Sequence, residues 1–171
     1  MTGKIIKGIG GFYYVDTKSG VFECHAKGLF RNKKEKPLVG DMVEMEEVPD
    51  TEKEMVGQIL RILPRKNELI RPLVSNIDQA ALVFAVKEPE PSFPLIDRFL
   101  LHLEAREIPC MLFFNKRDLL SECEADYREK MQSIYEKAGI PVYFFQSNTK
   151  EDREEILKLL KGKTTVFSGP S

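Results

Sequence analysis

Three short polar segments of the sequence carry groups that could bind a polar ligand. NKRD (115–118) offers an amide, an ammonium and a carboxylate within four residues. SNT (147–149) offers hydroxyls and a second amide, and SGPS (168–171) contains a glycine, which lets backbone N–H groups approach an anion. Each segment follows an apolar run that is typical of a buried strand. One such segment is weak evidence, because it can equally be a polar loop or a helix cap. Three together predict a binding site.

The second half of the chain alternates strand and helix patterns, which would bring these segments together. Continuous apolar runs predict four strands, at 80–86, 110–116, 142–147 and 164–167. Helical patterns predict three helices between them: one at 94–107, one that runs from a capping box of Ser121 and Glu124 to about residue 138, and one at 151–162. This order is typical of a parallel sheet with right-handed crossovers. Ligands of such sheets bind at the carboxyl ends of the strands, where all three polar segments would lie.

The first half of the chain has the short, closely spaced strand patterns of an all-β domain. Strand patterns cover 4–16, 20–28, 40–48 and 56–63. Glycines lie at the expected bends, and no stretch has convincing helical periodicity. Several strands in so short a segment favour a small barrel of the OB-fold type.

The overall composition is that of a globular protein that is not broadly basic. The 171 residues are 42% hydrophobic and 31% charged, with a net charge of −1. This balance excludes a globally basic nucleic-acid binder but leaves room for a local basic patch. The three cysteines, Cys24, Cys110 and Cys123, are too far apart in sequence for a zinc motif. With no signal peptide or long apolar span, the sequence predicts a cytoplasmic protein without membrane association.

The order of the polar segments carries a resemblance to a known family. NKRD matches the NKxD guanine-specificity element of P-loop GTPases, and SGPS (168–171) resembles the start of their phosphate loop, GxxxxGK(S/T). In most such proteins the phosphate loop comes first, whereas here it comes last, as in the circularly permuted GTPases. The barrel, the joining segment 67–84 and LIDRFL (95–100) resemble specifically the ribosome-small-subunit-dependent GTPase A family. The resemblance covers essentially the whole chain.

The resemblance implies a small all-β OB-fold barrel followed by a partial α/β P-loop GTPase domain with circularly permuted order. The domains would be an OB-fold at 1–66, a linker at 67–79 and the partial GTPase domain at 80–171. In the parallel sheet, strand 164–167 would lie beside 80–86, followed by 110–115 and then 142–146.

The resemblance also implies a role for each residue of a guanine site. Asp118 would accept hydrogen bonds from N1–H and the exocyclic amine of guanine, whereas adenine would leave the carboxylate unpaired. Asn115 would hold the base and the neighbouring loops, and the stem of Lys116 would pack over the ring. Ser147 and the backbone N–H of Asn148 would also contact the base. Arg117, at the variable third position of the motif, is given no role.

Gly169, Pro170 and Ser171 would begin the phosphate loop. The lysine and the Mg²⁺-binding Ser/Thr expected after them are not among the 171 residues. The sequence is therefore interpreted as the amino-terminal part of a longer GTPase, cut within the loop. It would have no catalytic or metal-binding residue of its own and would not hydrolyse GTP. The intact protein would use GTP or GDP with Mg²⁺, and zinc would belong to a carboxy-terminal domain outside this chain.

A basic loop in the barrel predicts RNA binding. The segment KGLFRNKKEK (27–36) groups basic residues around one aromatic residue: Lys27, Phe30, Arg31, Lys33, Lys34 and Lys36. Basic side chains attract phosphates, and an aromatic ring can stack on a base. The alternative is a solvated surface loop with a buried phenylalanine. The resemblance favours contact with 16S ribosomal RNA on the 30S subunit.

The resulting hypothesis is the amino-terminal part of a monomeric GTPase that binds the 30S ribosomal subunit and hydrolyses GTP during late small-subunit maturation. GTP would favour the ribosome-bound state, and hydrolysis would drive release. The alternative is a non-catalytic OB-fold RNA-binding module with a degenerate nucleotide domain, which would show no preference for guanine nucleotides. A flavodoxin-like redox domain, which would purify yellow with bound flavin, has no distinctive support in the sequence.

Overall fold

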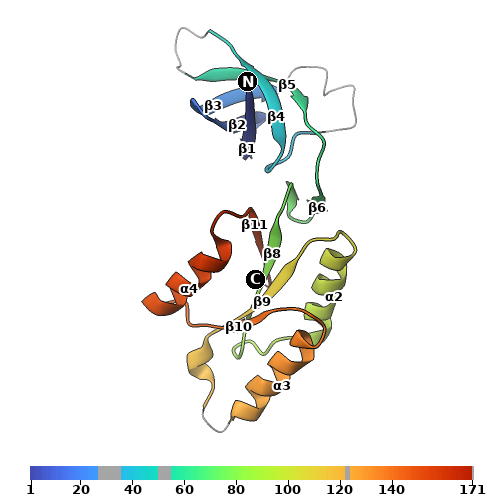
Figure 1. Ribbon diagram of the computed structural model, residues 1–171, viewed down its shortest axis with the longest axis vertical. Coiled ribbons are helices and arrows are strands. Elements are labelled where there is room, and N and C mark those ends of the chain that lie inside the picture. The colour runs from blue at the N-terminus through green and yellow to red at the C-terminus, as the bar shows by residue number, and fades with distance from the viewer. Residues whose placement is uncertain (27–35, 50–54, 122–123, 171) are drawn as a thin grey trace. The chain divides into compact units, whose positions relative to one another are not determined.

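The structure, a computed structural model, describes residues 1–26, 36–49, 55–121 and 124–170. The chain divides into two compact units, residues 1–77 and residues 78–171. The first unit contains strands β1 to β7, and the second contains strands β8 to β11 together with the helices (Figure 1).

Five strands of the first unit close into a barrel. They are β1 (Thr2–Ile9), β2 (Phe12–Thr17), β3 (Gly20–Ala26), β4 (Met42–Glu47) and β5 (Val56–Ile62). They pair around the barrel in the order β1-β2-β3-β5-β4. Alternate side chains point inward, so each strand contributes to one buried core. This core is formed by Ile5, Val15, Phe22, Cys24, Val43, Met45 and Ile59. The predicted small all-β barrel is confirmed.

The stretch 4–16, continuous as a strand pattern in the sequence, is two strands joined by a tight turn. β1 ends at Ile9 and β2 begins at Phe12, with Gly10 and Gly11 between them. Both glycines have positive φ, 60° and 88°, a conformation that residues with a Cβ atom rarely adopt. The two glycines therefore end the first strand, although β-forming residues lie on both sides of them.

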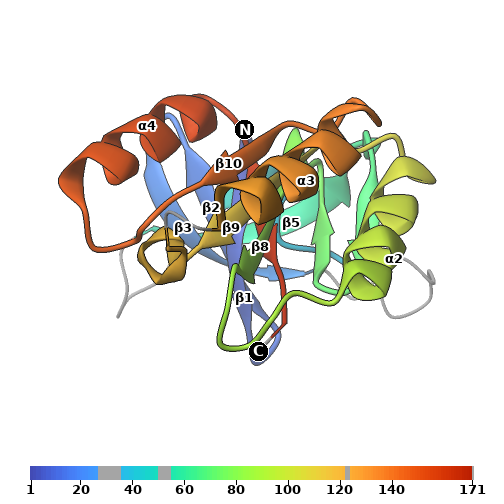
Figure 2. The same ribbon diagram turned by 90° about the horizontal axis from the view of Figure 1, so that it is seen from below.

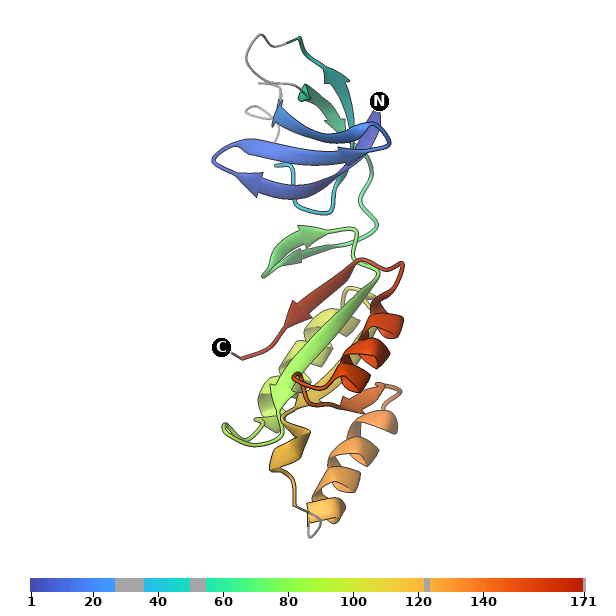
Figure 3. The same ribbon diagram turned by 90° about the vertical axis from the view of Figure 1, so that its left-hand side faces the viewer.

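Two further strands form a hairpin that belongs to the first unit. β6 (Glu68–Ile70) and β7 (Leu73–Ser75) pair with each other outside the barrel (Figure 3). A backbone bridge between Val39 and Val74 connects β7 to the loop that precedes β4. The segment after the barrel therefore has regular structure of its own.

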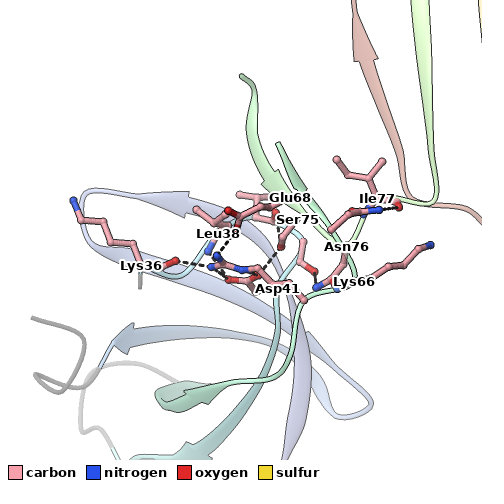
Figure 4. A network of polar contacts seen from close by, with 12 residues as sticks. Lys36, Leu38, Asp41, Lys66, Glu68, Ser75, Asn76 and Ile77 are labelled. Atoms are coloured by element: carbon pink, nitrogen blue, oxygen red, sulfur yellow. Dashed lines mark hydrogen bonds and ion pairs between the residues drawn. The ribbon is translucent and has the colours of Figure 1, made fainter. Parts of the chain in front are cut away.

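A buried carboxylate joins this hairpin to the barrel (Figure 4). The fully buried Asp41 accepts hydrogen bonds from Leu38 N–H and Ser75 Oγ, at 2.7 and 2.5 Å. Arg65 donates two more, from Nε at 2.8 Å and from Nη2 at 2.9 Å, and it also bonds Glu68. The hydrogen bonds to Asp41 raise the pKa of Arg65 further above its usual range. Removing one partner of a buried ion pair typically costs about 3–5 kcal/mol, so this contact is a main support of the unit.

The second unit is built on a four-stranded parallel sheet. Its strands are β8 (Gln79–Ala85), β9 (Cys110–Asn115), β10 (Val142–Phe144) and β11 (Thr165–Ser168). Their order across the sheet is β10-β9-β8-β11, and every neighbouring pair is parallel. Figure 3 shows β8 and β11 side by side. The predicted parallel sheet and its strand order, with the last strand beside the first, are confirmed.

Helices cover both faces of this sheet. They are α2 (Phe93–Glu104), α3 (Ala125–Glu136) and α4 (Lys150–Leu160). Phe99 of α2 packs edge-on against Phe84 of β8, whereas Ile156 and Leu159 of α4 pack on the opposite face, in the cluster that contains Phe113. Figures 1 and 2 show α3 on the same side as α2, with α4 on the other. No helix in the described ranges is long and apolar enough to cross a membrane.

Candidate functional site

The NKRD segment (115–118) forms a sharp turn at the carboxyl end of β9. Asn115 is the last residue of the strand, and Lys116 adopts a left-handed φ of 62° before the short helix η1 (Arg117–Leu119). A residue with a side chain needs local support in this conformation. The support comes from Asn115 Oδ1, which accepts a hydrogen bond from Lys116 N–H at 2.8 Å.

The same Asn115 oxygen reaches the second polar segment. It also accepts a hydrogen bond from Ser147 N–H, at 3.2 Å, in the loop that follows β10. Beside it, Arg117 N–H donates to the carbonyl oxygen of Phe145 at 3.1 Å. The structure therefore places the first two predicted segments in direct contact, although they are far apart in the sequence.

Three of the predicted guanine-binding residues are open to solvent. Asp118, Ser147 and Asn148 are exposed, whereas Asn115 and Lys116 are partly buried. Among the residues that the structure describes, none forms a hydrogen bond or ion pair with the Asp118 carboxylate. The hydrogen-bonding capacity of this carboxylate is therefore available to a ligand.

The third segment reaches the same edge of the sheet from β11. Ser168 pairs with Leu82 of β8, and Gly169 follows directly. A Cβ atom at Gly169 would lie 2.1 Å from the carbonyl oxygen of Val83, so the chain can approach β8 this closely only with glycine. Ser171 lies outside the described residues.

A cavity of about 280 Å³ connects the first and third segments. Asn115, Lys116 and Pro170 all line it, together with the end of β8 and the loop that follows. The Lys116 ammonium donates to the carbonyl oxygen of Glu88 in that loop. Pockets for whole ligands usually measure about 300–1,000 Å³, so this cavity is of a size to hold part of a nucleotide.

A second cavity, of about 770 Å³, lies at the amino-terminal ends of the strands. Its lining includes Gln79, Cys110 and Pro141. The Gln79 side chain is already engaged by Thr165 and Lys163, at 3.0 and 2.9 Å. Ligands of parallel α/β sheets bind at the carboxyl ends of the strands, so the smaller cavity is a candidate for part of the site, although Asp118, Ser147 and Asn148 are not among its lining residues.

An ion pair supports the loop after β8 from the side of α3. Lys87 pairs with Glu124, which also accepts hydrogen bonds from Ser121 N–H and Oγ at 3.0 and 2.8 Å. The hydrogen bond from Lys87, helped by those from Ser121, lowers the pKa of Glu124 to about 2. Glu124 is therefore ionised at neutral pH and connects this loop to the start of α3.

Most of the predicted RNA-binding residues fall outside the described part of the chain. These are Lys27, Phe30, Arg31, Lys33 and Lys34. Lys36 is described and exposed, and its side chain points away from the Asp41 network in Figure 4. Its carbonyl oxygen accepts a hydrogen bond from Arg65 Nη2 at 2.7 Å.

The outer face of β1, β2 and β3 adds aromatic and basic residues that belong to no sequence motif. The Lys7 ammonium lies 5.1 Å from the centroid of the Tyr14 ring, and the two residues pair across β1 and β2. The rings of Phe12 and His25 pack with their centroids 4.4 Å apart. The signal available in the sequence was strand alternation, since Val15 faces the core and its neighbour Tyr14 does not.

Family models match both halves of the chain. The RsgA GTPase model matches residues 62–171, and the RsgA N-terminal domain model matches residues 2–56. Two relatives, each called small ribosomal subunit biogenesis GTPase RsgA, come from Agathobacter rectalis and Alkaliphilus metalliredigens and are 50% and 45% identical to this chain. The matches cover 100% and 99% of this chain but 59% and 56% of the relatives. The chain therefore spans less than two thirds of their length.

Two solved structures share the fold. The crystal structure of YloQ, described as a circularly permuted GTPase, matches with a TM-score of 0.82 and 39% identity. YjeQ from Thermotoga maritima matches with a TM-score of 0.86 and 33% identity. Each match covers 99% of this chain and 60% of the solved one. Since one family model covers more than half of the sequence, and the relatives and solved structures agree with it, the chain belongs to the RsgA GTPase family.

Proposed function

We propose that the protein containing this chain is a GTPase that acts in the biogenesis of the small ribosomal subunit. The name shared by its relatives supports this proposal. Within the chain, the second unit would recognise guanine and begin the phosphate loop, and the barrel would bind RNA. Because the 171 residues do not contain a complete GxxxxGK(S/T) sequence, the proposal gives them no part in the cleavage of GTP.

One observation carries the guanine-binding part of the proposal. Asn115 Oδ1 bonds both Lys116 N–H and Ser147 N–H, so a single side chain holds the two base-contacting loops together. Asp118 follows Asn115 by three residues and is exposed. Two loops held in a fixed arrangement, with the Asp118 carboxylate available for hydrogen bonds, are suited to recognise the edge of a base.

The chemistry of that carboxylate favours guanine over adenine. Guanine presents two adjacent donors, N1–H and the exocyclic amine, to the two oxygens of Asp118. Adenine presents an acceptor at N1 and has no amine at the neighbouring carbon. An unpaired group of this kind costs about 1–3 kcal/mol, and more when it is charged. Asn115 and Lys116 would contact the base from the cavity that they line.

The proposal assigns no metal ion to the described residues. Within the described ranges, no three His, Cys, Asp or Glu side chains gather in a way that could hold one. Mg²⁺ would bind with the phosphates of GTP at the Ser/Thr of a complete phosphate loop. Zinc would belong to a carboxy-terminal domain outside these residues.

Isothermal titration calorimetry tests the guanine-binding proposal. An extended chain, continued past Ser171 through a complete GxxxxGK(S/T) sequence, should bind GDP and GTP in preference to ADP and ATP. The 171-residue chain should bind all four weakly or not at all, because its residues include only the SGPS part of a phosphate loop. An extended chain without preference for guanine would refute the proposal and favour an RNA-binding module with a degenerate nucleotide domain. Equal tight binding by both chains would refute the role of the loop.

We also propose that the barrel binds 16S ribosomal RNA through its basic loop and the outer face of β1 to β3. OB-folds bind oligonucleotides with a strand face and its flanking loops. The ring of Tyr14 and the packed rings of Phe12 and His25 offer surface on which bases can stack. Lys7 places a positive charge beside Tyr14, where it can meet a phosphate, and the Tyr14 hydroxyl donates to Glu23 Oε2 at 3.1 Å, so one carboxylate lies on the same face.

Binding of the 171-residue chain to 30S subunits at several salt concentrations tests this interface. Lys7→Gln should weaken binding and reduce the salt slope by about one, and Tyr14→Ala should weaken binding at every salt concentration. The matched control is Lys18→Gln, which removes the same charge from the exposed turn between β2 and β3. Equal effects of the two lysine variants would place the interface elsewhere.

A further inference from the structure

The variable residue of the NKRD segment has a partner in the structure. The Arg117 guanidinium lies 3.1 Å from the Asp152 carboxylate, which belongs to the first turn of α4. The Arg117 side chain is 41% exposed, but that of Asp152 is only 7% exposed. An almost buried carboxylate needs hydrogen bonds and a counter-charge, and Arg117 supplies the charge from a different segment.

The same carboxylate oxygen of Asp152 holds the loop that follows β10. Asp152 Oδ2 accepts a hydrogen bond from Gln146 N–H at 2.6 Å, and it is also the atom nearest to Arg117. A short hydrogen bond to an ionised acceptor is among the stronger kinds in proteins. Asp152 therefore connects the NKRD segment to the backbone immediately before Ser147.

Contacts on both sides of Gln146 add to this attachment, and Arg153 Nε of α4 also donates to the carbonyl oxygen of Ser147 at 3.1 Å. Arg117 N–H donates to the carbonyl oxygen of Phe145 at 3.1 Å, and Asn115 Oδ1 accepts Ser147 N–H at 3.2 Å. Three successive residues, 145 to 147, are therefore each bonded either to the NKRD segment or to Asp152, which Arg117 neutralises. This arrangement fixes the height and orientation of the loop relative to Asp118.

We propose that Arg117 and Asp152 are positioning residues that hold the Ser147 loop in the geometry needed for a guanine base. The proposal rests on the guanine-binding function proposed above. Neither residue contacts the base. Arg117 neutralises Asp152, Asp152 holds Gln146 N–H, and Ser147 and Asn148 are thereby presented next to Asp118. Loss of the pair lets the loop move away and speeds release of the bound nucleotide.

A simpler role for Asp152 makes a different prediction. Acidic residues in the first turn of a helix stabilise it through the helix dipole, and Asp152 occupies such a position in α4. If that were its main role, removing Arg117 would leave the Ser147 loop unchanged, since Arg117 is not part of α4. Variants of Arg117 therefore separate the two roles.

Amide hydrogen exchange in the nucleotide-free 171-residue chain tests the positioning role directly. Arg117→Ala should speed exchange at Gln146 and Ser147 by about tenfold, the effect of losing a charge-assisted contact. Arg117→Lys keeps the charge and should restore part of the protection. The matched control is Glu154→Gln, in the same helix, where Glu154 is exposed and 3.9 Å from Lys150. Unchanged exchange in Arg117→Ala, or an equal increase in the control, would overturn the proposal.

Nucleotide release from the extended chain provides the second readout. Arg117→Ala should speed GDP dissociation by about tenfold with little change in the association rate, because the loop acts after the nucleotide has bound. Arg117→Lys should recover part of the loss. Faster amide exchange with unchanged GDP dissociation would show that the pair only supports the fold. If the parent extended chain has no preference for guanine, the proposed function fails, while the exchange experiment still decides whether the pair holds the loop.

Discussion

Two carboxylates, one in each unit, show opposite uses of a polar side chain. In the first unit, the buried Asp41 is bonded by Arg65, Ser75 and Leu38, all from within the unit. In the second unit, Asp118 is exposed in the short helix η1 that follows β9, and the described residues give it no partner. Both are carboxylates that follow a sharp turn, but only one has its hydrogen bonds satisfied by the protein.

The difference distinguishes a carboxylate that stabilises the fold from one that is free to bind a ligand. A carboxylate that is fully bonded inside a unit stabilises the fold and has no capacity left for a ligand. An exposed one contributes little to stability, but it can bind an incoming group if the backbone around it is fixed. Here Asn115 and Asp152 fix the loop that follows β10 through the N–H groups of Ser147 and Gln146.

The largest effect on stability is expected from removing the buried carboxylate of Asp41. Asp41→Ala should lower the free energy of unfolding of the first unit by about 3–5 kcal/mol, because it leaves Arg65 without its buried partner. Urea titration followed by the NMR signals of the barrel measures this change. The control Glu44→Gln breaks the exposed pair with Arg61 and should leave the midpoint unchanged. Similar midpoints for Asp41→Ala and the parent chain would contradict the structural role of the network.

Thiol labelling compares how readily the two units open. Burial raises the pKa of Cys24, in the barrel core, to about 11 and that of Cys110, in the sheet, to about 12. In a Cys123→Ser background at pH 8, both thiols should react with iodoacetamide about a hundredfold more slowly than in denaturant, because little thiolate is present. Fast labelling of Cys24, which is buried, would show that the barrel opens locally, whereas fast labelling of Cys110, which is only partly buried, would show access from the surface.

The smallest effect is expected on the stability of the second unit at low pH, through protonation of Glu124. The pKa of Glu124 is lowered from 4.5 to about 2, chiefly by the hydrogen bond from Lys87. The contribution of this pair is therefore complete above pH 4.5 and is lost as the pH falls from 4.5 to 2, where the folded protein must take up a proton. Glu124→Gln should flatten the pH dependence of the stability of the second unit over that range. An unchanged slope would mean that the pair does not support the loop after β8.

Much of the fold could be predicted from local patterns. Apolar runs and helical periodicity predicted the parallel sheet of the second unit, and alternation predicted the barrel, because both signals arise from the burial of one face. The hairpin 68–75 was not recognised, since two strands of three residues are too short for a periodic pattern. Its attachment depends on Asp41, which is 34 residues away from Ser75 in the sequence and belongs to no recognisable motif.

The candidate site was only partly predictable, for a related reason. The types and spacing of Asn115, Lys116 and Asp118 are a recognisable motif, and so is the glycine at 169. The pairing of Arg117 with Asp152 is not, because a contact between residues 35 positions apart leaves no local periodicity. Long-range polar contacts of this kind become visible only when the strands are in place.

The nucleotide preference of an Asp118→Asn variant of the extended chain tests whether Asp118 reads guanine. Xanthine has a carbonyl group where guanine has its amine, so the amide of the variant can donate to it and accept from the adjacent N–H. We predict that the parent prefers GDP to XDP at least tenfold, that the variant reverses this preference, and that both unfold at the same urea concentration. An unchanged preference for GDP in a stable variant would contradict the account.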